Sequence, residues 1–426
     1  MKILIYTQYW KKGGIERLVK YLVDNLSEIE SGYQFSILTE DVPSPGEQFD
    51  LGRGVKVFFR KFTPFNLVNQ SKMREFVDWL NPDIVVTMGS TRALSRIPRA
   101  LVGSDYPVII SEHNCATEML RKFHNDIRFL NSVRYFADLN HFIFEEFSSD
   151  FDRTESVRVV SNPICSSSLR ADVCSSQSPK IVHVGRFQLD QKQQDVLVRS
   201  FALIADEFPS WTLELYGGDW FGAKAKIKAL VDELGLSDRV LLKGETDQVE
   251  KVLSSAQLFA FPSAFEGFGL VVGEALAVGL PVVAFAHCDG VNRLVHDREN
   301  GILVDGSVRS HVAFSRGLKL MMEDADLRSR LSSGALASVN DFSLELFLKG
   351  WSDIFDEAYR MRGRNRLRLL SNVERDYLEL VASGKLFDEK FANLRRLKRL
   401  NKVKGLLKRY YLWPIMRFVY KRLFSK

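Results

Sequence analysis

The most constraining feature of this 426-residue sequence is the stretch from Ala264 to Pro281, AFEGFGLVVGEALAVGLP. An apolar run, QLFAFPS, leads into it and has the length and composition of a buried parallel strand. The turn that follows contains two glycines, where a backbone must bend sharply or come close to a ligand. Leu270 to Val278 then fits a helix with inward-facing apolar residues. The stretch therefore predicts a strand, a ligand-facing turn and a helix.

Two carboxylates belong to this unit. Glu266 lies on the turn, and Glu274 lies further along, on the helix. A helix N-terminus presents free N–H groups and the positive end of the macrodipole, which suits a phosphate. Glu274 can then accept hydrogen bonds from paired ribose hydroxyls, and Glu266 from hydroxyls of a sugar. The alternative is that Glu266 is a solvated charge on a loop and that Glu274 is a helix residue paired with a neighbour. The flanking strand, the glycine turn and the following ALAVGLPVVAF favour the nucleotide-sugar site.

The segment from Glu266 to Phe285, EGFGLVVGEALAVGLPVVAF, resembles the signature of the retaining nucleotide-sugar glycosyltransferases of family 4. The resemblance extends over about residues 1–360 and is most specific between 181 and 305. It implies an α/β protein with the GT-B fold, in which two Rossmann-like doubly wound domains face each other across a cleft. It also implies that no metal is needed. The donor-sugar contacts then come from Glu266 and from the backbone amides of Phe268, Gly269 and Leu270.

The N-terminal half begins with KILIYT, Gly13-Gly14 and a helix-periodic segment, which is the entry of a doubly wound domain. The two glycines would let the backbone approach a phosphate or a sugar, although an ordinary tight turn needs them equally. In the family this pair faces the donor. Further strands alternating with helical or loop stretches are predicted at Phe35–Thr39, Val55–Phe59, Ile84–Met88 and Val108–Ser111.

One histidine follows a predicted strand directly. His113 comes after VIIS and thus lies at the ligand edge of the sheet. A single histidine is more often structural than catalytic, but the family places a histidine of this loop against the donor sugar. We therefore predict His113 and Glu266 as the catalytic residues. Among the other histidines only His287, just past the strand PVVAF, has a comparable position.

The second domain begins with a strand at Lys180 to Val184, after which Arg186 and Lys192 follow in one loop. An arginine offers a bidentate fork for phosphate oxygens and a lysine a mobile charge. The family uses such a pair to hold the pyrophosphate; two surface cations are the alternative. Gln193 stands where relatives often have glycine. Gly244, after another predicted strand, lies where the family reads the base through backbone groups.

The predicted organisation has five parts. Residues 1–165 form the first, acceptor-binding domain, and the serine-rich stretch 166–179 is a linker. Residues 180–345 form the nucleotide-sugar domain. Residues 346–362 form a helix that crosses back to the first domain, and 363–426 a basic helical tail.

Composition limits where the protein works. It is ordinary for a globular protein, with 46% hydrophobic residues, and no apolar run reaches the roughly 18 residues that span a bilayer. The N-terminus opens as a strand without the pattern of a signal peptide. The four cysteines, Cys115, Cys165, Cys174 and Cys288, have neither metal-site nor disulfide-framework spacing. We therefore expect a cytoplasmic protein with no structural metal and no cofactor beyond its nucleotide-sugar co-substrate.

The net charge of +6 depends on the tail. Residues 390–426 contain thirteen Lys or Arg and no Asp or Glu, so the rest of the chain carries −7. Leucines and valines recur there every three or four residues between the cations, which predicts a basic amphipathic helix. We favour an anionic membrane surface as the partner of 391–426. The alternatives are docking on the protein's own acidic body and, less favoured, a nucleic-acid patch.

Together these patterns predict a retaining hexosyltransferase bound peripherally to the inner face of the cell membrane. Its donor is a UDP-sugar, and its acceptor a lipid-linked oligosaccharide or polysaccharide in lipopolysaccharide, capsule or exopolysaccharide synthesis. One alternative is another GT-B activity, such as a nucleotide-sugar epimerase or hydrolase. The other is a non-catalytic, membrane-associated glycan-binding protein.

Overall fold

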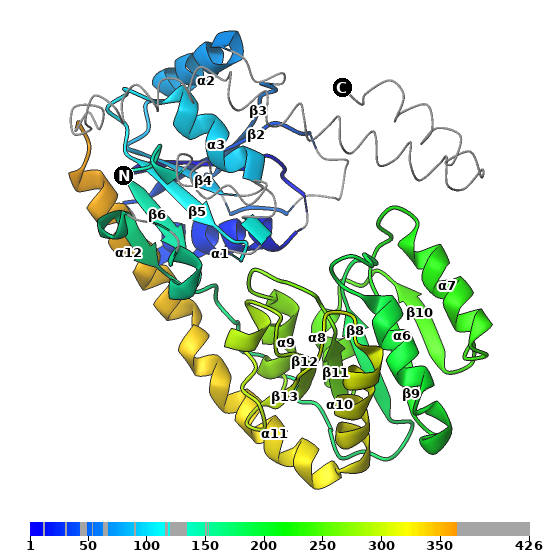
Figure 1. The fold of residues 1–426 in the computed structure, drawn as a ribbon. Coiled ribbons are helices and arrows are strands. Elements are labelled where there is room, and N and C mark those ends of the chain that lie inside the picture. The colour runs from blue at the N-terminus through cyan, green and yellow to red at the C-terminus, as the bar shows by residue number, and fades with distance from the viewer. Residues whose placement is uncertain are drawn as a thin grey trace, which may run out of the picture.

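The computed structural model describes residues 1–363 except 12, 30–31, 43–48, 53, 63–66, 89–90, 116–117, 120–133, 150 and 152. Two lobes face each other, and successive helices between residues 325 and 360 run along one side of both (Figure 1). The predicted basic tail lies outside the described residues from 364 onward, so it stays a prediction. Within the described part of the chain, no helix combines the length and apolar character needed to cross a membrane.

The N-terminal lobe is built on a parallel sheet in the order β3-β2-β1-β4-β5-β6-β7. The inner strand β1 pairs with β2 on one side and β4 on the other, with Ile3 opposite both Phe35 and Ile84. Its strands are β1 (Lys2–Tyr6), β2 (Gln34–Thr39), β3 (Lys56–Phe59), β4 (Ile84–Met88), β5 (Val108–Glu112), β6 (Leu139–Phe142) and β7 (Val157–Val159).

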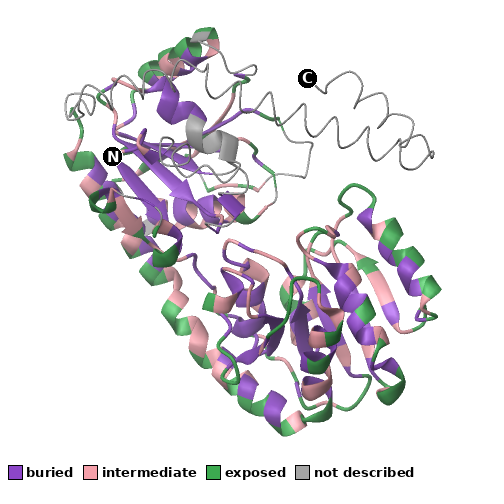
Figure 2. Cartoon of the chain, in the orientation of Figure 1, coloured by how far each residue is buried: buried purple, intermediate pink, exposed green. Residues whose placement is uncertain are grey.

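Helices α1 (Gly14–Ile29), α2 (Leu67–Leu80) and α3 (Thr91–Ala100) cover this sheet. Helix α1 is amphipathic because Leu18, Val19, Leu22, Val23 and Leu26 recur at helical spacing and are buried. Strands β1, β4 and β5 are buried on both faces, as expected for the centre of a parallel sheet with helices on both sides (Figure 2).

The C-terminal lobe repeats the arrangement with a parallel sheet in the order β10-β9-β8-β11-β12-β13. Its strands are β8 (Lys180–Val184), β9 (Thr212–Tyr216), β10 (Val240–Gly244), β11 (Leu258–Phe261), β12 (Val282–Phe285) and β13 (Gly301–Val304). Its helices are α6 (Gln194–Ala202), α7 (Ala223–Glu233), α8 (Val249–Ser254), α9 (Leu270–Ala277), α10 (His311–Glu323) and α11 (Ala325–Ser338).

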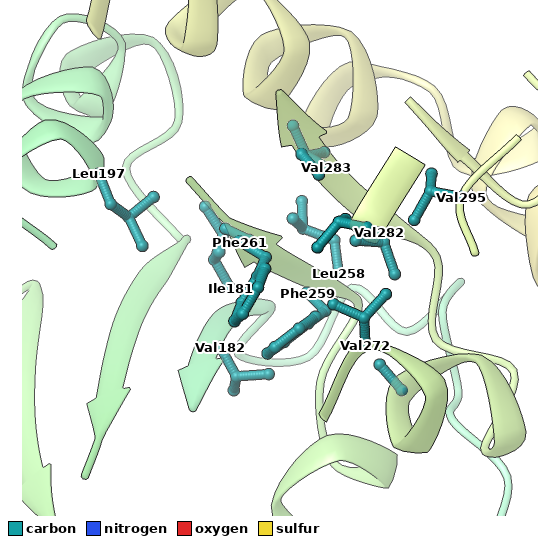
Figure 3. Packing of buried hydrophobic residues seen from close by; sticks show 14 of the residues in the cluster. Ile181, Val182, Leu197, Leu258, Phe259, Phe261, Val272, Val282, Val283 and Val295 are labelled. Atoms are coloured by element: carbon teal, nitrogen blue, oxygen red, sulfur yellow. The ribbon is translucent and has the colours of Figure 1, made fainter. Parts of the chain in front are cut away.

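The core of this lobe lies between its central strands and α6 and α9 (Figure 3). Ile181 and Val182 of β8, Phe259 of β11 and Val282 of β12 are fully buried, and Val272 of α9 packs with them. A strand that buries both faces is apolar at nearly every position. The doubly wound, two-domain α/β fold expected from the sequence is thus confirmed.

Helix α12 (Leu344–Arg360) returns from the C-terminal lobe and packs on α1 and β4 of the N-terminal lobe. Trp351 is fully buried there, with its ring 4.7 Å from that of His141 and 5.4 Å from that of Phe355. Arg158 of β7 donates a hydrogen bond of 2.6 Å to Glu357 and ties the helix to the sheet edge. The N-terminal lobe therefore completes its core with the last described helix.

The structure adds several details to the sequence prediction. Strand β6, with the sequence LNHF, was not predicted, because a four-residue strand with two polar residues gives almost no periodic signal. Strand β7 is short and ends at Val159. Helices α10 and α11 meet at Asp324, whose carboxylate accepts a hydrogen bond of 2.7 Å from the Leu327 N–H and caps α11.

We predict that Trp351→Ala lowers the free energy of unfolding by about 3–5 kcal/mol, the usual cost of removing a fully buried tryptophan. The control is Tyr359→Ala on the same helix, where the side chain is 44% exposed and the cost should stay within about 0.5 kcal/mol. Urea unfolding followed by circular dichroism measures both. Equal losses in the two variants would contradict the role assigned to α12.

Candidate functional site

The start of α9 forms the floor of the candidate site. Gly269 has φ of 85°, in the left-handed region, and is the N-cap of the helix. Glycine is required there because a Cβ atom makes that conformation costly. The Val272 N–H donates a hydrogen bond of 2.7 Å to the Gly269 carbonyl and closes the first turn. The first N–H groups of α9 lack intrahelical acceptors, so they can receive an anion.

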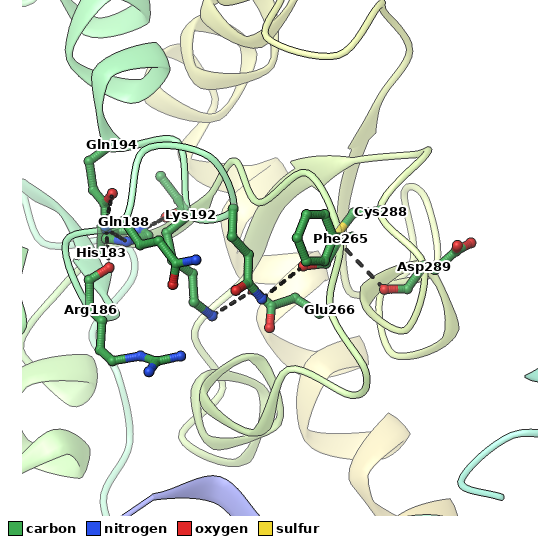
Figure 4. A network of polar contacts seen from close by, with 11 residues as sticks. His183, Arg186, Gln188, Lys192, Gln194, Phe265, Glu266, Cys288 and Asp289 are labelled. Atoms are coloured by element: carbon green, nitrogen blue, oxygen red, sulfur yellow. Dashed lines mark hydrogen bonds and ion pairs between the residues drawn. The ribbon is translucent and has the colours of Figure 1, made fainter. Parts of the chain in front are cut away.

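A buried ion pair lies next to this helix start (Figure 4). The Lys192 amine is 2.5 Å from Oε1 of Glu266, and the two side chains are 13% and 9% exposed. The same amine lies 4.9 Å from the centre of the Phe261 ring. The structure thus joins two residues that the sequence predicted separately, from the loops after β8 and β11. Because each charge is largely out of water, removing one would leave the other uncompensated.

The residue after this lysine explains a departure noted in the sequence. Gln193 has φ of 52° and is the N-cap of α6. That left-handed conformation is the one that glycine adopts most easily, which accounts for the glycine in relatives. The loop therefore takes the shape a glycine would give, and Lys192 still reaches Glu266.

Arg186 leaves the same loop and is held by an aromatic ring. Its guanidinium carbon lies 4.8 Å from the centre of the Trp220 ring, in the loop after β9. A cation over an indole face is an attractive arrangement that restricts the arginine. Trp220 was not predicted, because a cation–π partner from another loop leaves no local pattern in the sequence. Arg186 and Lys192 thus lie on one loop, but Arg186 is held by an aromatic ring and Lys192 by a carboxylate.

The N-terminal lobe reaches this site at two points. A Cβ atom on Gly14, at the start of α1, would lie 3.4 Å from a Leu270 methyl group of α9. A Cβ atom on Gly267 would lie 1.8 Å from the carbonyl oxygen of His113, so only glycine allows this approach. The predicted residues Gly13, Gly14 and His113 are therefore brought to the Glu266 loop and the start of α9.

His113 is a neutral, buried imidazole. Its Nε2 lies 2.8 Å from the Ser111 hydroxyl, which in turn lies 2.8 Å from Nδ1 of His141. Burial and, to a smaller extent, the neighbouring His141 lower the pKa of His113 to about 3, although an interaction with the Asn162 side chain raises it. The pKa of His141 is also lowered by burial, to about 4. At neutral pH His113 can therefore donate and accept hydrogen bonds but carries no charge.

The first turn of α1 supplies two charged residues that the sequence analysis missed. The Glu16 carboxylate lies over Gly13, where a Cβ atom would be 2.5 Å from its Oε2. Burial raises the pKa of Glu16 to about 7, while its own backbone N–H and the charge of Arg186 lower it. Arg17 forms an ion pair with Glu274 of α9. Both residues lie just after the predicted Gly13-Gly14 turn. Their place beside this turn is the sequence feature that could have predicted them as site residues.

The remaining predicted residues lie further along the same sheet edge. Gly244 ends the edge strand β10 with φ of 84°, and its carbonyl accepts a hydrogen bond of 2.7 Å from Gly217. His287 stacks on Phe285 with 4.8 Å between ring centres, and burial lowers its pKa. Phe268 is buried against Phe144 of the other lobe, so only its backbone can face a ligand.

Comparison with known proteins agrees with this geometry. Residues 12–166 match the family model "Glycosyltransferase Family 4", and residues 170–337 match "Glycosyl transferases group 1". The two matches together cover both lobes and every predicted site residue.

The chain belongs to glycosyltransferase family 4. This family 4 glycosyltransferase is 25% identical to an uncharacterized glycosyltransferase of Haemophilus influenzae over 357 residues, or 80% of this chain and 96% of that one. It is also similar to the N-acetylgalactosamine-N,N'-diacetylbacillosaminyl-diphospho-undecaprenol 4-alpha-N-acetylgalactosaminyltransferase of Campylobacter jejuni, with 34% identity over 163 residues. The matched segment covers 38% of this chain and 42% of that enzyme.

Among solved structures, the fold is similar to that of Anabaena HepE in complex with UDP-glucose. The TM-score is 0.69 at 19% identity, over 84% of this chain and all of that one. The likeness confirms the GT-B arrangement of the two lobes.

We predict that Glu16→Gln stabilises the protein in a pH-dependent way. A carboxyl whose pKa rises from 4.5 to about 7 on folding lets the unfolded chain lose its proton first, so stability falls as pH rises through that window. The glutamine variant lacks this loss. The difference in free energy of unfolding between variant and wild type should therefore grow from pH 4.5 to about 7 and then level off.

The control is Glu233→Gln on the exposed side of α7. It reports the general effect of replacing a carboxylate by an amide, which is subtracted from the result for Glu16→Gln. Denaturant titrations without nucleotide measure all three proteins, and a flat difference for Glu16→Gln would show that this carboxyl is not desolvated.

Proposed function

We propose that this family 4 glycosyltransferase transfers a sugar from a UDP-sugar to a lipid-linked oligosaccharide or a polysaccharide, with retention of configuration and without a metal or other cofactor. The observation that carries the proposal is the buried Lys192–Glu266 pair beside the N-terminus of α9. A cation, a hydroxyl acceptor and free helix N–H groups at one place match a diphosphate joined to a sugar.

Each part of the donor has a proposed partner. Arg186 and Lys192 hold the pyrophosphate, and Glu274 accepts hydrogen bonds from the ribose hydroxyls. Glu266 and the backbone N–H groups at the start of α9, those of Phe268, Gly269 and Leu270, hold the sugar. Gly13 and Gly14 let the first lobe approach the phosphates, and the backbone around Gly244 faces the base.

Catalysis in this proposal is mainly electrostatic. As the bond between the sugar and the diphosphate breaks, negative charge develops on the leaving oxygen, and Arg186, Lys192 and the α9 dipole stabilise it. These groups are already oriented by their own partners, so they need little reorganisation. His113, being neutral, contributes a hydrogen bond to the sugar rather than a proton.

The acceptor and location are inferred from relatives and from the sequence. The name of the Campylobacter relative describes an enzyme that acts on a diphospho-undecaprenol substrate. A lipid-linked acceptor would keep an enzyme at the inner face of the cell membrane, where a basic tail is useful. The proposed pathway is the assembly of a cell-surface glycan.

Two alternatives from the sequence remain to be separated by experiment. A nucleotide-sugar epimerase or hydrolase would change the donor without an acceptor, and a glycan-binding protein would leave it intact. Incubating the protein with a panel of UDP-sugars, with and without lipid-linked acceptors, distinguishes the three. Product that forms only with an acceptor, keeps the donor's anomeric configuration by NMR, and is unaffected by EDTA supports the proposal; turnover without acceptor overturns it.

We predict that Lys192→Met weakens UDP binding about 10- to 100-fold, because a charge-assisted hydrogen bond contributes roughly 1.5–3 kcal/mol. The matched control is Lys228→Met on α7, where the amine is in an exposed ion pair with Asp232. That variant should bind UDP as the wild type does. Isothermal titration calorimetry measures both affinities, with melting curves to verify folding. Unchanged UDP affinity in folded Lys192→Met would remove this lysine from the phosphate site.

A further inference from the structure

The first turn of α1 and the first turns of α9 come from different lobes and lie against each other. A Cβ atom on Gly14 would lie 3.4 Å from a Leu270 methyl group, and one turn further in each helix Nη1 of Arg17 donates to Oε1 of Glu274. The Arg17 and Glu274 side chains are 33% and 26% exposed, so the pair is partly shielded from solvent. The residue proposed to bind ribose is therefore already held by the other lobe.

A small cavity of about 50 Å³ adjoins this pair. Its polar lining faces Glu274 from α1, from the segment after β7 and from α8. The lining includes Arg17, Tyr21, Cys165, Glu250 and Glu274. Among these residues only Arg17 brings a positive charge. Arg17 is thus the group that compensates the Glu274 carboxylate.

We propose that Arg17 is a positioning residue: it orients the Glu274 carboxylate, keeps it negatively charged for the ribose hydroxyls, and thereby links nucleotide recognition to the N-terminal lobe. This inference rests on the proposed function, in which Glu274 binds the ribose. Arg17 engages only Oε1. A carboxylate has about four acceptor sites on two oxygens, so both ribose hydroxyls can still donate to Glu274 while the arginine stays in place.

The electrostatics around the pair agree with this role. Burial raises the pKa of Glu274, the charge and hydrogen bond of Arg17 lower it, and Glu250 raises it again. Without Arg17 the pKa would rise further, and Glu274 would become protonated at a higher pH. A protonated carboxyl accepts fewer hydrogen bonds, so ribose binding should weaken on the acidic side first.

The experiment measures UDP affinity by calorimetry between pH 5.5 and 8.5. We expect Arg17→Met to bind progressively more weakly than wild type as the pH falls, by at most about tenfold for each unit by which the Glu274 pKa rises, and to stay within about threefold of wild type at pH 8.5. Arg17→Lys keeps the charge and should restore most of the acidic-side affinity. The control is Lys20→Met, also on α1, whose amine pairs with Asp24 instead; its pH profile should follow the wild type.

Glu274→Gln separates this inference from the function beneath it. If that variant binds UDP as well as wild type, the ribose assignment fails and the role of Arg17 fails with it. If it binds weakly, the assignment stands, and adding Arg17→Met should then cause no further loss. Three results would overturn the positioning role alone. Arg17→Met could bind UDP as well as wild type, it could lose the same affinity at every pH, or it could lose as much affinity in the Glu274→Gln background as in the wild type.

Discussion

The arrangement of the site depends on the way α9 is held between the two lobes. Gly273 leaves room for Ile164, which would otherwise lie 2.7 Å from a Cβ atom there, and Leu270 meets Gly14. The Phe268 ring stacks on Phe144 of the first lobe with 5.6 Å between centres. These contacts are tight and apolar, so they tolerate little displacement. The helix start that faces a diphosphate is therefore placed by both lobes and not by its own sheet alone.

The charged groups of the site are satisfied by one another. Lys192 pairs with Glu266 and Arg17 with Glu274, while the charge of Arg186 acts on Glu16. Pairing is needed because the desolvation of an isolated charge costs more than burial of apolar surface can offset. A ligand that takes part in these contacts has to bring anionic oxygens for the cations and hydroxyls for the carboxylates. Simple phosphates or neutral sugars meet only half of this requirement.

The sequence predicted the parts of the site that are local. The strand, glycine turn and helix around Glu266 depend on neighbouring residues, and the structure has all three. The pairing of Glu274 with Arg17 joins residues 257 positions apart, which no local pattern reveals. The raised pKa of Glu16 depends on its burial in the folded protein, which its neighbours in the sequence do not reveal. The backbone conformation of Gln193 could not be predicted because a residue other than glycine suggests a negative φ. In the structure Gln193 has a positive φ of 52°.

The chain crosses between the lobes twice, and the two crossings are joined. The Ile164 N–H, in the first crossing, donates a hydrogen bond of 2.7 Å to the Phe342 carbonyl, which directly precedes α12. The Phe342 ring packs edge-on against Phe268 at the start of α9. A change in the angle between the lobes must turn about this joined pair, because both connections are fixed there. Ile164 also contacts Gly273, so the pivot lies against the nucleotide-facing helix, and the ion pair of the next residue, Glu274, should move least.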